Sequence, residues 1–211
     1  MTLPMQTSST CYICQNISTH MILASTNRFG APDLDLRPPE MERSTMSWWI
    51  QECPYCGYVA SDISCATTVT EEWLKSEAYR SCENVTFKFA LAEKFYKQYL
   101  IAIQEGKHRT AFYAVLHAAW VCDDAHDIDN AIYCRKKALE IWDKVVVREN
   151  ERETFSLIRA DLLRRSEQFD LLITEYKKKK FSDELLDKIV AFQIEKAKQK
   201  DTACYTVAHV K

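Results

Sequence analysis

Two Cys-x-x-Cys pairs constrain this chain more than any other feature of its sequence. Cys11 and Cys14 form the first pair, and Cys53 and Cys56 form the second. Two thiolates three positions apart on a tight turn can bind one cation, and two such pairs complete the shell of a tetrahedral zinc site. Because four thiolates leave no coordination position for water or substrate, we predict one structural zinc ion per chain and no catalytic metal.

Other uses of these cysteines fit the sequence less well. A thioredoxin-like redox motif needs a βαβ setting, which the sequence does not indicate. A disulfide framework is typical of small secreted domains, whereas this chain has 211 residues and an N-terminal stretch with no apolar run. Iron–sulfur ligation stays open, because ligand type alone does not distinguish it from zinc. His20 is a substitute ligand in the same part of the chain.

The overall composition argues against several classes of partner. A net charge of -2 gives no basic field to recruit nucleic acid or an anionic membrane. No stretch approaches the roughly 20 apolar residues that span a bilayer. The chain has nine cysteines, an odd number, and those outside the two pairs are scattered, which is typical of a reducing compartment. We therefore predict a cytoplasmic protein that does not bind membranes and for which nucleic acid is a disfavoured partner.

The composition also changes sharply along the chain. All five prolines lie at or before Pro54, and the first lysine is Lys75. We predict that residues 1–10 are disordered, that residues 11–66 form a zinc-ribbon-like head, and that residues 67–211 form a helical body. The predicted fold class is mainly α, with a small β-rich head followed by antiparallel helical hairpins.

Within the head, short strands are predicted at residues 20–26 and 47–52, each close to a cysteine pair. A zinc ribbon supplies its ligands from turns next to strands in this way. So small a head cannot bury enough apolar surface by itself, and we expect the metal to contribute directly to its folding.

Within the body, apolar residues recur at helical spacing, and Gly106 has the character of a helix C-cap. Short links between the helices predict antiparallel hairpins. The predicted helices cover residues 70–82, 84–106, 107–122, 128–148, 152–166, 169–180 and 182–200.

The segment AFYAVLHAAWVCDDAHDIDNAIYCRKKALEIW, which begins at Ala111, resembles a tetratricopeptide repeat. Large residues lie on its first helix, and small alanines lie on the second, where the two helices approach closely. The next unit, from Thr154, is similar but degenerate. Because two weak repeats are fewer than a free-standing stack needs, we expect the head and the last helix to cap it.

An acidic segment, DLDLRPPE, lies between the two cysteine pairs. Asp33 and Asp35 are two residues apart, so in an extended stretch they and Arg37 face the same side. Such carboxylates can bind a hard cation or serve an enzyme, but an arginine beside them favours a structural ion-pair cluster. We favour the ion-pair cluster and keep an enzyme that uses these three residues as an alternative.

Four features together resemble an uncharacterised family of bacterial proteins. They are CPYCGY after a Trp-rich strand, the DLDLRPPE segment, the tetratricopeptide-like body and the ending FQIEKAKQKDTACYT. The resemblance covers most of residues 11–206 and departs from the family at Gln15, where a glycine is usual. The family is a domain of unknown function with a zinc-knuckle head, so the resemblance implies the architecture and no activity.

The predicted function is a zinc-stabilised protein-interaction module without catalysis. The concave face of a helical-hairpin stack is lined by the first helix of each hairpin, here residues 107–122 and 152–166. We expect basic side chains there to be exposed and to bind an acidic or C-terminal carboxylate motif of a protein or peptide partner, unless they only pair with local carboxylates. These side chains are Arg109, Arg159 and Arg164.

Two further expectations concern other sites. A nucleic-acid-associated zinc ribbon is an alternative function, which the lysine-free head disfavours. His117 lies on the inner side of a predicted helix, and we expect it to be a hydrogen-bonded core residue rather than a catalytic base.

Overall fold

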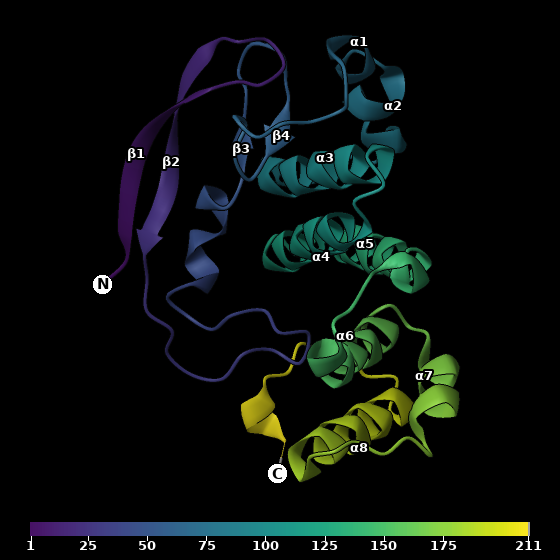
Figure 1. Ribbon diagram of the computed structural model, residues 1–211. Coiled ribbons are helices and arrows are strands. Elements are labelled where there is room, and N and C mark those ends of the chain that lie inside the picture. The colour runs from purple at the N-terminus through teal and green to yellow at the C-terminus, as the bar shows by residue number, and fades with distance from the viewer. Residues whose placement is uncertain (211) are drawn as a thin grey trace.

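The computed structural model describes residues 1–210. Two β-hairpins and a long irregular segment lie beside a column of stacked helices, and the C-terminal tail returns to that segment (Figure 1). The chain is mainly helical, with small antiparallel sheets in its N-terminal part, as the sequence predicts.

The first hairpin pairs β1 (Leu3–Thr10) with β2 (Ile17–Ser25) in antiparallel register. The prediction that residues 1–10 are disordered is therefore wrong. Their sequence has few buried apolar positions, but the ladder with β2 extends from Thr10 back to Leu3 and satisfies main-chain groups along the strand.

The second hairpin pairs β3 (Gln51–Glu52) with β4 (Val59–Ala60). Of the predicted strand at 47–52, only Gln51–Glu52 is extended, and residues 47–48 belong to the 3₁₀ helix η1 (Arg43–Trp48). The backbone N–H of Trp49 donates to the carbonyl of Met46 and closes this turn, so that extended structure starts only at β3.

The body begins with two single-turn helices, α1 (Glu71–Leu74) and α2 (Glu77–Arg80), where one helix was predicted. Ser76 separates them, because its extended backbone ends the first helix and its side chain caps the second. The remaining helices are α3 (Ala90–Gln104), α4 (His108–Asp124), α5 (Ile128–Glu140), α6 (Arg152–Arg165), α7 (Phe169–Tyr176) and α8 (Glu184–Lys198). Short 3₁₀ turns are η2 (Cys82–Asn84), η3 (Trp142–Lys144), η4 (Glu149–Glu151) and η5 (Val207–His209).

Four helices end in the same tight reversal. The helices α3, α4, α6 and α8 are followed by a residue in the left-handed region: Gly106, His126, Glu167 and Lys200, with φ between 51° and 69°. In each case the next backbone N–H donates to the carbonyl five residues earlier, at 2.8–3.0 Å, which satisfies a free helix end. The predicted cap at Gly106 is confirmed.

Consecutive helices from α3 to α7 pack against one another, and α8 packs on both α6 and α7. The turns η3 and η4 lie in the connection between α5 and α6. A large apolar cluster joins the head to α3, α4, α5 and α6, and a smaller one joins α6, α7 and α8 to Leu34. Head residues Cys11, Cys53 and Ile63 belong to the larger cluster. The β-hairpin turns are therefore packed on the helices.

Candidate metal centre and the buried segment beside it

The two cysteine pairs occupy equivalent hairpin turns, one between β1 and β2 and the other between β3 and β4. Gln15 and Gly57 follow the pairs, with φ of 59° and 75°, and each donates its N–H at 2.9 Å to the carbonyl of Cys11 or Cys53. Glycine adopts this left-handed conformation most readily. Gln15 nevertheless adopts it, so the first turn keeps the shape of the second.

These turns bring the four sulfur atoms of Cys11, Cys14, Cys53 and Cys56 within 4.8 Å of one another. The Sγ atoms of Cys11 and Cys56 are 3.6 Å apart, and those of Cys14 and Cys53 are 3.5 Å apart. A tetrahedral ion with bonds of about 2.3 Å to sulfur separates its ligands by about 3.8 Å. A disulfide would need about 2.05 Å. The four thiols form a candidate metal centre.

Local hydrogen bonds prepare one of these thiols for ligation. Burial raises the pKa of the Cys11 thiol. Burial acts in the same direction on Cys14, but hydrogen bonds from Asn16 outweigh it and lower the pKa to about 7. His20 does not join the group, because its ring shares a 2.8 Å hydrogen bond with Ser18 on β2. The cysteines alone supply the ligand set.

The acidic segment is buried against α4 and α6. Asp33, Asp35 and Arg37 expose only 1%, 1% and 3% of their surface. Asp35 accepts a 2.7 Å hydrogen bond from Nε1 of Trp120, and Arg37 forms a two-point ion pair with Asp124. The segment thus lies against the sides of α4 and α6 that carry Trp120 and Arg165.

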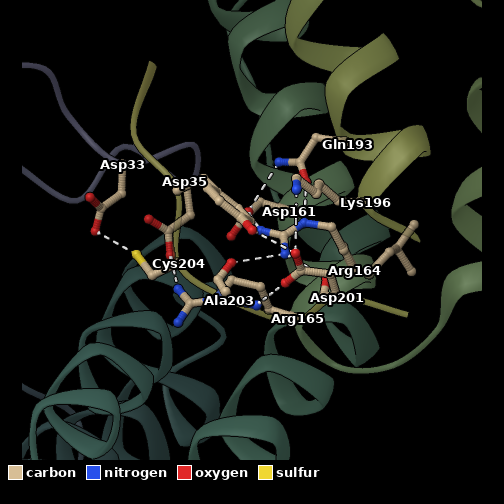
Figure 2. Close-up of polar contacts among 12 residues, drawn as sticks. Asp33, Asp35, Asp161, Arg164, Arg165, Gln193, Lys196, Asp201, Ala203 and Cys204 are labelled. Carbon is tan, nitrogen blue, oxygen red and sulfur yellow. Dashed lines mark hydrogen bonds and ion pairs between the residues drawn. The ribbon is translucent and has the colours of Figure 1, made fainter. Parts of the chain in front are cut away.

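The C-terminal segment closes over the other end of this network (Figure 2). Arg164 donates to Asp161 at 2.8 Å and to Gln193 at 2.5 Å. It also donates to the carbonyls of Asp201 and Ala203, at 2.8 Å and 2.9 Å. One side chain of α6 therefore fastens α8 and the tail together.

Carboxylates and guanidiniums balance within the network. Burial alone would raise the pKa of Asp123, but Arg135 and Arg165 lower it. The network joins Asp33, Asp35, Asp123, Asp124 and Asp161 to Arg37, Arg43, Arg135, Arg164 and Arg165. Each of the five carboxyl groups has a guanidinium within 3.6 Å, and burial raises the pKa of Asp35.

The arginines predicted to bind a partner differ in their surroundings. Arg164 is fully buried, so the expectation that it is exposed is wrong: α6 is covered by α8 and the tail on the side that carries it. Arg109 pairs with Glu151 at 2.9 Å and Arg159 pairs with Glu175 at 2.8 Å, near the surface. Two of the three arginines thus remain within reach of a partner.

His117 lies on α4 among aromatic rings. Ring centroids of Trp49, Phe95 and Trp120 are 5.3 Å, 5.2 Å and 4.9 Å from its own. No hydrogen bond to its ring occurs within residues 1–210, contrary to the expectation of a hydrogen-bonded core residue. Burial, with a contribution from Arg37, lowers its pKa to about 4, so the imidazole is neutral at pH 7.

This neutral imidazole makes folding sensitive to acid. Between the ordinary histidine pKa of 6.5 and the folded value of about 4, the unfolded chain binds the extra proton, so stability falls as the pH is lowered through this range. Because the ring is only half-buried, we expect His117 to contribute about 1–2 kcal/mol of this loss. Urea unfolding of His117→Phe from pH 7 to pH 4 should show a flatter profile than wild type. Equal slopes for His117→Phe and wild type would contradict the assignment.

Comparison with known proteins adds no analogy to this site. The chain matches no protein-family model, no curated protein and no solved structure. Within residues 1–210, no helix combines the length and the apolar character needed to cross a membrane. Function is therefore inferred from the geometry described above.

Proposed function

We propose that this protein is a zinc-stabilised protein-interaction module of the cytoplasm, and that the metal is structural. The observation that supports this most is the closed set of four sulfurs, all within 4.8 Å of one another, at the tips of two hairpins packed on the helices. Four thiolates complete the coordination of zinc and leave no position for substrate. The ion holds the head against the helical column.

The helical body supplies the proposed binding surface. Successive hairpins of the tetratricopeptide type would present the first helix of each pair, α4 and α6, on one face. The chain's own acidic segment already covers the middle of that face, where Asp35 and Arg37 reach Trp120 and Asp124. A protein or peptide partner is therefore expected beside the segment, at the near-surface arginines Arg109 and Arg159.

The two alternative functions have weaker support. An enzyme at Asp33, Asp35 and Arg37 would need accessible groups, and these side chains are buried in ion pairs. A nucleic-acid-binding ribbon would need a basic surface, and the chain carries a net charge of -2. The resemblance to an uncharacterised bacterial family agrees with the proposed architecture and adds no activity.

One preparation tests the proposal. Protein isolated from its native cell without chelators should contain about one zinc per chain and should co-purify with a protein partner after cross-linking. Charge reversal of Arg109 and Arg159 to glutamate should abolish capture and leave the melting temperature within a few degrees, because surface ion pairs contribute little stability.

A matched control separates the charge of the surface from its local pairing. Arg109→Glu combined with Glu151→Arg restores the ion pair but leaves the charge at position 109 reversed. Capture by this double variant would show that the arginine acts only through its pairing with Glu151. Iron with acid-labile sulfide in place of zinc would overturn the metal assignment.

A further inference from the structure

A cavity of about 490 Å³ opens between the acidic segment and α4. Its size lies within the range of roughly 300–1,000 Å³ that is typical of small-molecule sites. It lies beside the part of α4 that the acidic segment covers, on the side nearer to η1. The residues that decide its chemistry are Asp35, Glu42, Trp49, Tyr113, His117 and Trp120.

Part of the cavity wall is aromatic, and the indole nitrogens of its two tryptophans already donate hydrogen bonds. Nε1 of Trp49 donates to Thr45 at 2.9 Å, and Nε1 of Trp120 donates to Asp35 at 2.7 Å. Each indole therefore offers only carbon surface to an occupant. Such rings favour a flat group that can stack on a face or meet an edge.

Two polar groups of the walls have no hydrogen-bond partner within residues 1–210. They are the imidazole of His117 and the hydroxyl of Tyr113. The two residues are four positions apart on α4, so both side chains lie on the same side of the helix. Both residues are only partly buried and line the cavity, so their polar atoms are open to hydrogen bonds with an occupant.

The charged groups of the walls are already paired. Asp35 accepts from Trp120 and lies 3.6 Å from Arg165, and Glu42 forms an ion pair with Arg28. The cavity therefore has no unpaired ion to serve as counter-charge. A charged ligand would lose its hydration without compensation, whereas an uncharged one would not.

We propose that this cavity is a binding site for a small, uncharged, planar heteroaromatic molecule, which stacks on Trp49 and Trp120 and hydrogen-bonds to His117 and Tyr113. The neutral imidazole offers one donor and one acceptor, so it can meet a ring nitrogen or an exocyclic amide or amine. The site is separate from the metal centre and from Arg159, whereas the guanidinium of Arg109 lies 5.6 Å from the centre of the Tyr113 ring. Its occupancy does not depend on a protein partner.

Calorimetric titration with defined probes tests the proposal on the metal-loaded full chain. Adenine and nicotinamide are planar and uncharged at pH 7.5, and both should bind saturably with a Kd of about 1 mM or tighter. Benzamidine as a cation, benzoate as an anion and cyclohexanecarboxamide as a non-planar amide should each bind at least about tenfold more weakly.

Variants locate the binding in this cavity. His117→Phe keeps a flat ring among the aromatic side chains but removes the hydrogen bond, and it should weaken adenine binding about tenfold. Tyr113→Phe is a milder second variant with the same expected direction. His126→Asn, at an exposed position outside the cavity, should bind like wild type.

Three results would overturn the proposal. One is the lack of saturable binding of both neutral planar probes up to about 10 mM. Another is equal affinity for the charged or the non-planar probes. The third is unchanged adenine binding in both His117→Phe and Tyr113→Phe when thermal unfolding shows that these variants are folded.

Discussion

Serine in place of Cys56 is expected to release the metal and unfold the head, while α4 to α8 remain helical. Binding of a structural zinc ion is worth about 10–16 kcal/mol in small zinc domains, far more than the apolar contacts of two short hairpins. The loss should spread to α1 and α2, because Tyr79 of α2 donates a 2.7 Å hydrogen bond to the carbonyl of Gly57, next to the lost ligand. The helices α6, α7 and α8 have their own apolar cluster with Leu34.

Circular dichroism and hydrogen exchange measure this effect by segment. We expect fast exchange in residues 3–25, 51–60 and 71–80, and protection in α4 to α8. Cys65→Ser is the matched control: this exposed cysteine lies outside the sulfur cluster, and its variant should keep both metal and protection. Complete loss of helical signal in Cys56→Ser would mean that head and helices unfold as one cooperative unit.

Methionine in place of Arg164 is expected to lower the free energy of unfolding by about 3–5 kcal/mol. The substitution leaves the buried carboxylate of Asp161 without its counter-ion and frees Gln193 and two tail carbonyls. Urea unfolding measures the loss. Hydrogen exchange should also show that residues 201–207 detach.

Two comparisons test whether buried charge causes this loss. Arg159→Met removes an arginine of the same helix whose ion pair with Glu175 is near the surface, and it should lose less than about 1 kcal/mol from the pair. Arg164→Met combined with Asp161→Leu removes both buried charges and should recover much of the stability. A double variant no more stable than Arg164→Met would assign the loss to the tail contacts.

The four cysteines of the candidate metal centre could be identified from the sequence because their spacing is local within each pair. To form a four-cysteine metal site, two Cys-x-x-Cys turns need only to lie next to each other in the fold. The helices were predictable for a related reason, since apolar periodicity is a local signal. The reversals after α4 and α6 were not, because His126 and Glu167 occupy left-handed positions where glycine would be the usual indication.

The buried charge network has no comparable local signal. Arg37 and Asp124 are 87 residues apart, and no pattern marks them as partners. Arg164 reads as an exposed position of an amphipathic helix, and only the packing of α8 and the tail buries it. The strand at Leu3–Thr10 also depends on its partner, because a polar stretch becomes ordered only through the ladder with β2.

The return of the tail also affects the order in which the protein can fold. Leu34 donates its N–H to the carbonyl of Tyr205 at 3.0 Å, and Val207 donates to the carbonyl of Pro32 at 2.9 Å. Asp33 meets Cys204 across 171 residues of sequence. During synthesis the helices form from local contacts as they emerge. The acidic segment can form its contacts with residues 204–207 only after almost the whole chain has been made. Contacts of such separation form late and slowly, so the contacts between the acidic segment and the tail are the last to form in a newly made chain.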